Sequence, residues 1–552
     1  MSSDLAIETH ELRKRFGAKD AVSGLTLAVP RGSICGFLGS NGAGKTTTLK
    51  MLMGMTKVSG GEGRALGLQI ADARQSTEIR RRTGFVSEDK RFPWSITVGE
   101  LLRFTRAFYP GWRPDLAERY LNAFRLPPRA SAGRLSKGLR SRLALLLALA
   151  RGAELLLLDE PTEGLDPSMI EEALQALVSL VAEQGTTVFF SSHQLANVEQ
   201  IADHVCIIDQ GRAVVSDSLD ELKARYRRVR LVFEGDPPPR RLRRGPPGRA
   251  HPVPAREPER GRDRRAGEGH EGAFRRRAAG DPQGHLPRML ERSVVMSAAD
   301  KVLWYKAWTE TRSFFRLGLT FLMASALALY VGYPDDYSKH FPNGAIAVSA
   351  EQVKALLHDG KAYIWLSWFG TSLLLGLSFL ALALASTGLV RSPEGGASPG
   401  VTYALSMPVS RRKLAGVRVA TGFLELATAA ILPSVLVCLL APTQGQSFPI
   451  RDGMAHVLLA MSGVSSLYGL FVFISTVLGE LSKAVLGGAV LFLYGMFTFL
   501  TNGVRRFSVF RLMTGDTYFL RGEIPWLGVL ACVAFTAGLV YASVRLVERR
   551  DF

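Results

Sequence analysis

One glycine-rich stretch limits the fold of the N-terminal part of the chain more than any other feature. The sequence SICGFLGSNGAGKTTTLKMLMGM, residues 33–55, reads as an apolar strand, a turn rich in glycine and a helix. It contains the pattern G-x-x-x-x-G-K-T, whose glycines let backbone N–H groups surround phosphate oxygens. The lysine of such a turn reaches phosphate, and the hydroxyl that follows it suits Mg²⁺. The stretch therefore predicts an α/β domain that binds a nucleotide at the start of a helix.

Two later strands are expected to bring ionisable side chains to the same edge of this domain. Leu155–Leu158 form an apolar strand followed by Asp159 and Glu160, and the strand TTVFFSS is followed by His193. Ligands of open α/β sheets bind at the carboxyl ends of the strands. We therefore expect Asp159 to hold Mg²⁺, Glu160 to polarise the attacking water and His193 to contact the γ-phosphate.

In this order, the stretches resemble the ATP-binding subunit of ABC transporters over about residues 5–230. The run RLSKGLRSRLALLLALA is similar to the signature sequence of that family. The resemblance implies that Ser136 and Gly138 contact the γ-phosphate held by another subunit, and that Asp166 lies in a loop at the dimer seam. It therefore implies a second copy of the chain, or a close homologue, as a partner.

The resemblance also implies ATP and Mg²⁺ as cofactors and assigns roles to individual residues. The expected catalytic residues are Glu160 and His193, and the expected metal ligands are Thr46 and Asp159. Phe16 matches the aromatic residue that stacks on adenine. The residues expected to contact the nucleotide are Phe16, Gly39, Ser40, Asn41, Gly42, Ala43, Gly44, Lys45, Thr46, Thr47, Glu88, Ser136, Gly138 and Asp166.

Two positions depart from the family pattern. Glu88 replaces the usual glutamine after the third strand, and its carboxylate can still contact water or Mg²⁺ but adds negative charge. The signature reads S-K-G-L-R rather than S-G-G-Q. Because Glu160 is intact, we expect ATP turnover despite both departures.

The last 250 or so residues contain long, nearly uncharged runs, which predict an all-α membrane domain with six helices. The six expected spans are about 316–333, 364–390, 422–441, 455–478, 484–500 and 524–544. Before the first span, residues 296–318 place tryptophans and basic residues in a pattern typical of an interfacial amphipathic helix. An even number of spans returns the C-terminus to the side of the ATP-binding domain, so both termini are expected in the cytoplasm.

The segment between the second and third spans, residues 389–418, is basic and contains Pro408. It resembles the cytoplasmic loop of small six-helix bacterial ABC export permeases, in which a short helix docks on the ATPase. This favours residues 394–413 as a coupling element, and the alternative is a solvated basic loop near lipid head groups. Within the third span, Glu425 and Pro433 either line a transport path or serve as an end charge and a kink.

Residues 236–292 differ from both neighbouring parts. They contain fifteen arginines, no lysine and a single aromatic residue, Phe274. Such a composition predicts disorder. A nucleic-acid-binding tail and a linker that touches anionic lipid are alternatives, and we favour an out-of-frame reading that joins two neighbouring genes. Resequencing tests this hypothesis: one uninterrupted reading frame across 236–292, with no sensible protein sequence in the other frames, would refute it.

Together these features predict an ABC ATP-binding domain at 1–230, a linker at 231–295 and a six-span permease at 296–552. The expected protein is a multi-pass half-transporter of the cytoplasmic membrane that exports a hydrophobic or amphipathic compound. Its expected partners are membrane lipid and a transported small molecule or peptide, with no nucleic acid. One alternative is a membrane sensor that binds an antibiotic or lipid and signals to a partner. Another is a soluble ATPase acting on nucleic acid, favoured by the net charge of +19 but opposed by the six spans.

The four cysteines, Cys35, Cys206, Cys438 and Cys532, lie far apart and show no metal-ligand spacing. We expect them to be buried thiols in a reducing compartment.

Overall fold

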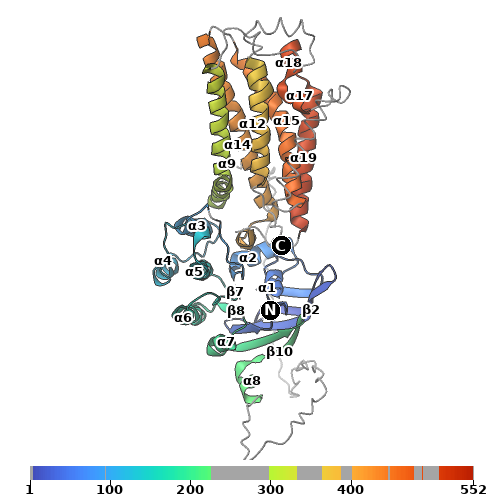
Figure 1. Ribbon diagram of the computed structural model, residues 1–552. Coiled ribbons are helices and arrows are strands. Elements are labelled where there is room, and N and C mark those ends of the chain that lie inside the picture. The colour runs from blue at the N-terminus through green and yellow to red at the C-terminus, as the bar shows by residue number, and fades with distance from the viewer. Residues whose placement is uncertain are drawn as a thin grey trace, which may run out of the picture.

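The computed structural model describes residues 4–93, 95–225, 297–331, 364–386, 401–444, 448–477, 488 and 509–550. Figure 1 shows two parts: an α/β domain formed by the first two of these ranges, 4–93 and 95–225, and a helical bundle formed by the later ones. The predicted linker and the predicted fifth span at 484–500, apart from Gly488, lie outside the described residues.

The α/β domain is built on a six-stranded sheet with the strand order β10-β9-β3-β8-β7-β6. All neighbouring strands in it pair in parallel except β10 and β9. From one edge to the other the strands are β10 (Arg212–Ser218), β9 (His204–Asp209), β3 (Ile34–Leu38), β8 (Thr187–Ser192), β7 (Leu155–Asp159) and β6 (Thr83–Val86). Every residue of β3, β7 and β8 is buried, as expected for parallel strands covered on both faces.

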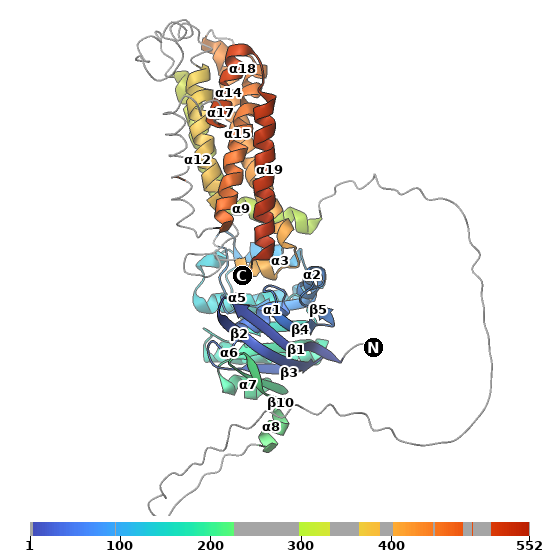
Figure 2. The same ribbon diagram turned by 90° about the vertical axis from the view of Figure 1, so that its right-hand side faces the viewer.

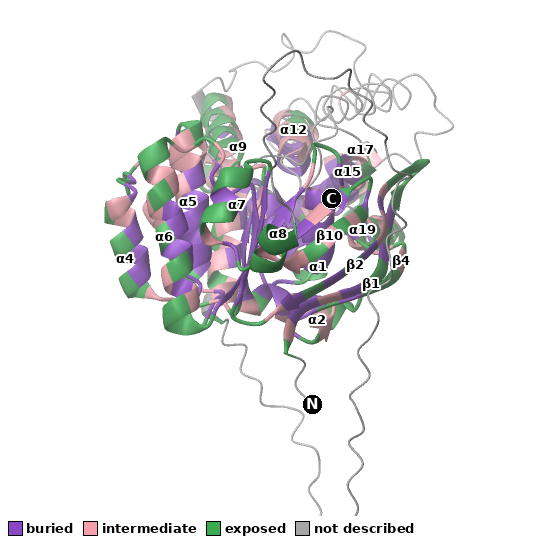
Figure 3. Cartoon of the chain, turned by 90° about the horizontal axis from the view of Figure 1, so that it is seen from below, coloured by how far each residue is buried: buried purple, intermediate pink, exposed green. Residues whose placement is uncertain are grey.

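A second, antiparallel sheet has the strand order β2-β1-β4-β5. Its strands are β2 (Lys19–Pro30), β1 (Leu5–Phe16), β4 (Gly60–Ala65) and β5 (Leu68–Gln69). The helices of this domain are α1 (Lys45–Leu52), α2 (Ala73–Arg82), α3 (Val98–Arg106), α4 (Pro114–Ala123), α5 (Lys137–Leu149), α6 (Pro167–Gln184), α7 (Leu195–Ile201) and α8 (Leu219–Arg225), with a 3-10 turn at Ala132–Arg134. Figure 3 shows that buried residues follow the strands in the middle of the domain, with helices α5 and α6 on one side of them and strands β1 and β2 on the other.

The described part of the bundle contains five helical stretches long and apolar enough to cross a membrane. They are Ala299–Leu329, Ser367–Ser386, Arg411–Thr443, Ile450–Val477 and Trp526–Arg549. The elements are α9 (Ala298–Val331), the π-helical η3 (Trp365–Ser372), α12 (Leu373–Ser386), α13 (Val401–Ser406), α14 (Arg411–Leu440), η4 (Ala441–Gln444), α15 (Ile450–Val477), α17 (Val509–Thr514), α18 (Asp516–Arg521) and α19 (Trp526–Arg549). These five stretches overlap five of the six predicted spans, and the first and third begin well before the predicted starts.

The outer surface of the bundle carries large apolar side chains. Leu317, Phe379, Leu439 and Leu527 are 72%, 64%, 64% and 86% exposed, and they come from four different helices. An aqueous protein rarely leaves so much apolar surface in water. This surface is therefore suited to contact lipid.

The helix expected at 296–318 is not a separate element before the first span. Residues 298–331 form one continuous helix, α9. Leu303, Ala307 and Thr311, spaced four residues apart, are buried. The polar residues near its start pair with protein: Asp300 forms an ion pair with Lys413 of α14. The N-terminal half of α9 thus packs on protein along one face.

The bundle stands directly on the α/β domain, and Figure 2 shows the lower ends of α9 and α19 beside it. Tyr305 of α9 donates a hydrogen bond to Glu100 of α3 at 3.3 Å. Lys57 donates to the carbonyl oxygen of Arg549, the last residue of α19, at 3.3 Å. The end of α19 therefore lies on the same side of the bundle as the α/β domain.

The four cysteines are free and buried, as predicted.

Candidate functional site

The glycine-rich turn lies between β3 and α1, where the sequence places it. Gly42 and Gly44 have φ angles of 83° and 111°, a backbone region that side chains rarely adopt. A Cβ atom on Gly44 would lie 2.5 Å from the carbonyl oxygen of Ala21. Lys45 Nζ lies inside the turn, where it donates to the carbonyl oxygens of Gly39 at 2.7 Å and Ser40 at 3.2 Å. This is the geometry of a phosphate-binding loop at a helix N-terminus.

The remaining residues of the turn differ in exposure. Ser40 and Asn41 are exposed, Ala43 is buried, and Thr46 and Thr47 are half-buried. The turn therefore offers its open side to a ligand and its buried side to the core.

Asp159, the last residue of β7, and Glu160, which follows it, lie beside the end of β8, because the two strands are neighbours in the sheet. Ser191 links them: its hydroxyl donates to Asp159 Oδ1 at 2.7 Å and accepts from the Glu160 N–H at 3.0 Å. His193 Nδ1 lies 2.9 Å from Glu160 Oε2. The Glu160 side chain is 9% exposed and that of His193 is 51% exposed. The expected general base is thus held by the residue expected to contact the γ-phosphate.

Asp159 has the features of a cation ligand. It is 1% exposed, and among the described residues its Oδ2 atom has no hydrogen-bond partner. Burial raises the pKa of Asp159, and the hydrogen bond from Ser191 opposes this shift. Thr46 Oγ1 donates to Glu88 Oε2 at 3.1 Å, so Glu88 reaches the phosphate-binding turn. Oxygen atoms of Thr46, Asp159 and Glu88 are the kind of ligand that Mg²⁺ prefers.

Two residues of the site escaped the sequence analysis. Ser191 belongs to the run TTVFFSS, and a hydroxyl at the carboxyl end of a buried strand was the available signal. Lys90 donates from Nζ to the carbonyl oxygen of Glu160 at 2.8 Å, and burial lowers the pKa of its ammonium group. It supports the catalytic turn, in which Glu160 adopts a left-handed φ of 48°.

Phe16 ends β1 and is 44% exposed, and the ammonium group of Lys14 lies 4.6 Å from its ring centroid. An exposed ring at this position is free on one face for stacking on a base.

The signature residues lie at the start of α5 and interact with the loop before α6. Ser136 caps α5 by accepting the N–H of Leu139 at 3.3 Å. A Cβ on Gly138 would lie 3.0 Å from the carbonyl oxygen of Gly164. Asp166 caps α6 by accepting the N–H of Met169 at 3.0 Å, and Arg142 pairs with it at 2.7 Å.

The predicted site residues therefore fall into two groups. Hydrogen bonds tie Lys45 into the turn, Thr46 to Glu88, and Glu160 to His193. In the described part of the chain, no hydrogen bond or ion pair joins Ser136, Gly138 or Asp166 to the residues of the turn at 39–47.

Comparisons with known proteins agree with this geometry. The family model described as ABC transporter matches residues 22–163. The bacitracin transport ATP-binding protein BcrA of Bacillus licheniformis is 37% identical over 230 residues, which cover 41% of this chain and 74% of that protein. The daunorubicin resistance ATP-binding protein DrrA2 of Streptomyces coeruleorubidus is 36% identical, covering 40% and 68%. The Nod factor export ATP-binding protein I of Burkholderia lata is 37% identical, covering 38% and 69%.

A solved ATP-binding subunit of an ABC transporter is 27% identical, and the match covers 40% of this chain and 92% of that one, with a TM-score of 0.37.

The identity and coverage of the BcrA match show that the chain belongs to the ABC transporter family. Its N-terminal part is an ABC domain that binds and hydrolyses ATP, and it is followed by a helical region suited to a membrane.

Residues 401–413 of the predicted coupling segment pack on the ATPase domain, and residues 394–400 lie outside the described part. Arg80 Nε donates to the carbonyl oxygen of Met407 at 3.0 Å. Arg411 Nη2 donates to that of Met55 at 2.6 Å. These contacts favour a docked coupling element over a solvated loop.

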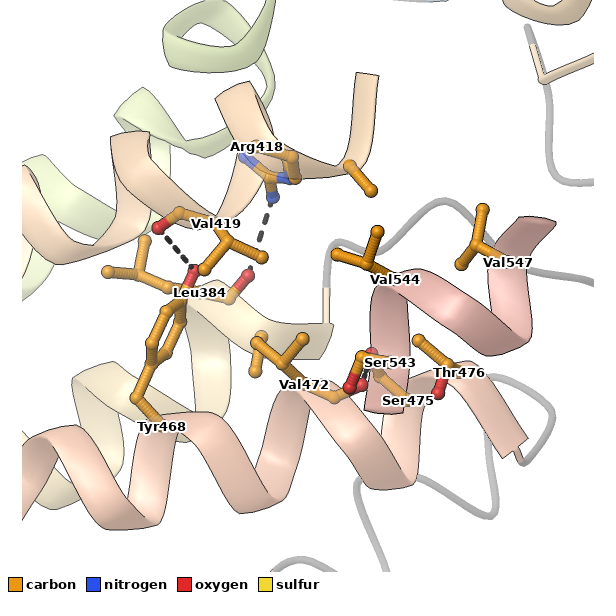
Figure 4. A pocket seen from close by; sticks show the side chains of 12 residues that line it. Leu384, Arg418, Val419, Tyr468, Val472, Ser475, Thr476, Ser543, Val544 and Val547 are labelled. Carbon is orange, nitrogen blue, oxygen red and sulfur yellow. Dashed lines mark hydrogen bonds between the residues drawn. The ribbon is translucent and has the colours of Figure 1, made fainter. Parts of the chain in front are cut away.

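A small cavity of about 40 Å³ lies between α12, α14, α15 and α19, near their ends closest to the ATPase domain. Its walls are mostly apolar, with the guanidinium of Arg418 and the hydroxyls of Tyr468, Ser475 and Ser543 among them (Figure 4). Arg418 Nη2 donates to the carbonyl oxygen of Leu384 at 3.4 Å.

Glu425 and Pro433 are both buried in α14, and neither lines this cavity. Glu425 Oε1 accepts a hydrogen bond from Thr311 of α9 at 2.6 Å. In the described structure Glu425 thus joins two helices of the bundle, rather than standing as an end charge.

Proposed function

We propose that this protein is an ATP-driven ABC half-transporter that exports a hydrophobic or amphipathic compound across the cytoplasmic membrane. On this proposal the ATPase domain comprises residues 1–230 and the permease residues 296–552, with both termini in the cytoplasm. The observation that carries the proposal is the direct packing of Ser406 and Met407 on a domain whose ATP site holds Glu160 against His193 at 2.9 Å. Three relatives whose names refer to bacitracin transport, daunorubicin resistance and Nod factor export support export as the direction.

Two chains are required to complete each ATP site. The turn at 39–47 binds the phosphates, and Ser136 and Gly138 of the second chain contact the same nucleotide. The division of the site residues into two groups supports this arrangement, because neither group contains a complete set of phosphate contacts. The partner is a second copy of the chain or a close homologue.

In the assembled site, Lys45 and the turn bind and orient the phosphates, and Phe16 stacks on adenine. Thr46 and Asp159 would hold Mg²⁺, which would supply charge neutralisation at the phosphates. Glu160 accepts a proton from the attacking water, and His193 keeps the Glu160 carboxylate in place. The unpartnered Oδ2 atom of Asp159 supports its assignment as a metal ligand.

The cavity between α12, α14, α15 and α19 marks a place where a lipophilic cargo could be accommodated only after a rearrangement. Its side chains are apolar with a few polar groups, as in most small-molecule sites. It is too small for a drug-sized molecule in the present conformation. A cargo site would require the helices to separate when the ATPase domains move.

Replacing Glu160 by Gln tests the assignment of the base. The variant should bind ATP and form a stable dimer of ATPase domains, while turnover falls by about 10²- to 10⁴-fold, the usual contribution of a general base. ATP turnover and particle mass of the full-length protein in lipid nanodiscs are the measurements. Glu163→Gln is the matched control, because Glu163 lies three residues further on and pairs with Lys137 at 2.7 Å. Unchanged hydrolysis by the Glu160 variant would refute the assigned base.

A further inference from the structure

The chain is held firmly just after the C-terminal end of α13, at residues 407–411. The buried guanidinium of Arg80 donates to the carbonyl oxygens of Met407 at 3.0 Å and Met53 at 3.1 Å. Arg411 donates to the carbonyl oxygen of Met55 at 2.6 Å. Hydrogen bonds from a charged donor are about twice as strong as neutral ones. This end is therefore fixed to the segment that follows α1.

Near the N-terminal end of α13, the side chain of Tyr403 packs against the ATPase domain. Its ring meets that of Phe92 edge-on, with centroids 5.6 Å apart, and its hydroxyl is hydrogen-bonded to Thr105. Arg151 lines the same small cavity as Tyr403. The guanidinium carbon of Arg151 lies 4.5 Å from the ring centroid of Tyr109. Aromatic packing therefore dominates this end.

Arg151 is in an unusual electrostatic position. It is 2% exposed, its guanidinium interacts with the hydroxyl of Tyr403, and no carboxylate pairs with it within the described residues. A buried cation without a carboxylate partner is costly. The cavity that it lines has a volume of about 20 Å³ and lies between segment 85–92, helix α5 and helix α13. The N-terminal part of α13 thus borders a small void beside a buried cation.

Two elements that reach the ATP site meet at Tyr403. Phe92 belongs to the segment that carries Glu88, which contacts Thr46, and Lys90, which contacts Glu160. This segment therefore contacts both the phosphate-binding turn and the residue after β7 within the same chain.

The second element is helix α5. It begins at the cap residue Ser136, and Arg151 follows two residues after its end. A helix of 13 residues is about 20 Å long and behaves as a rod. Arg151 is therefore linked rigidly to the residue that would contact the nucleotide bound by the other chain.

We propose that Tyr403 is the contact through which both halves of the composite ATP site act on the membrane domain, with Arg151 as its positioning residue. The proposal rests on the proposed function, because it requires a dimer in which ATP closes the ATPase domains. Movement of Phe92 and of α5 displaces Tyr403, while the Met407 end serves as the pivot. The bundle then follows through α14, which begins four residues after Met407.

The test compares movements of the two domains in the full-length protein in lipid nanodiscs, with Glu160→Gln to hold the ATP-bound state. The natural cysteines are buried, so exposed introduced cysteines can be spin-labelled selectively. Val214→Cys, at a position 62% exposed, reports on the ATPase domains, and Leu527→Cys, at 86%, reports on the bundle. The parent should show an ATP-dependent change in the distance between the two copies at both positions.

In Arg151→Met and in Tyr403→Ala, the change at position 214 should remain, while the fraction of molecules that respond at position 527 falls at least about 5-fold. The double variant should be no worse than either single one, because the two residues act through one contact. Arg151→Lys, which keeps the cation, should restore part of the response. Tyr120→Ala is the matched control: Tyr120 is a buried tyrosine of the same domain that stacks on Phe124, and both changes should persist.

A full response at position 527 in Arg151→Met and Tyr403→Ala would overturn the proposal. If Arg151→Met fails to fold, Tyr403→Ala decides the question by the same comparison. Additive losses in the double variant would also contradict a shared contact. Absence of any ATP-dependent change at position 214 in the parent would instead contradict the proposed function.

Discussion

Ser191→Ala should separate the chemistry of the ATP site from its assembly. The hydroxyl of Ser191 serves Asp159 Oδ1 at 2.7 Å and the N–H of Glu160 at 3.0 Å, and all three residues are buried. Removing it leaves two polar groups without this partner and releases the turn that carries Glu160, the proposed general base.

The expected magnitude follows from these two contacts. A buried polar group that loses its hydrogen bond costs about 1–3 kcal/mol, so the free energy of unfolding of the ATPase domain should fall by about that amount or somewhat more. A small displacement of the base lowers the rate by about 10- to 100-fold. ATP affinity should change little, because the turn at 39–47 is untouched.

ATP turnover, nucleotide affinity and thermal unfolding of the full-length protein measure these effects. Thr186→Ala is the control, since its hydroxyl donates to the carbonyl oxygen of Ala153 at 3.1 Å at the opposite end of β8. The control should lose stability but keep its turnover. Equal turnover in Ser191→Ala and the parent would refute the role given to Ser191.

Three further predictions test other parts of the account. Gly44→Ala should abolish ATP binding in a filter or calorimetric assay, because its Cβ would lie 2.5 Å from the carbonyl oxygen of Ala21, and normal affinity would contradict the turn geometry. Burial raises the pKa of Asp159 above its ordinary value, so its ionised form costs stability at neutral pH. Asp159→Asn should therefore raise the melting temperature of the nucleotide-free protein at pH 7, and this gain should disappear as the pH falls through the raised pKa of Asp159. The same variant should not hydrolyse Mg-ATP. A lower melting temperature at pH 7 would contradict the cost assigned to the ionised Asp159. Thr311→Val removes the hydrogen bond to Glu425 and should lower the free energy of unfolding of the bundle by about 1–3 kcal/mol. An unchanged unfolding midpoint in detergent would show that this contact is not needed.

The phosphate-binding turn and the residues after β7 could be predicted because their chemistry requires neighbouring residues on one strand and one turn. Gly44, Lys45, Asp159 and Glu160 are all found where the sequence places them. Ser191 and Lys90 contact the turn at Glu160 from separate elements, and only the fold brings them there.

Five long apolar helices of the bundle were predictable from length and hydropathy, but their contacts were not. The charged start of α9 suggested a helix lying on lipid. In the structure Asp300 pairs with Lys413, and Lys306 pairs with Glu310 at 2.7 Å, so these charges are satisfied within the protein. The docking of Tyr403 on Phe92 and Thr105 depends on side chains far apart in the sequence, and no local pattern reveals it.

ATP-driven transport in sealed vesicles tests the central claim most directly. The full-length protein would be reconstituted with ATP outside, and a panel of lipophilic fluorescent compounds would be followed into the vesicle interior. The account predicts that at least one compound accumulates with ATP and Mg²⁺ and that Glu160→Gln stops it. Hydrolysis at the parent rate without accumulation of any compound, or equal accumulation in the Glu160 variant, would contradict the account.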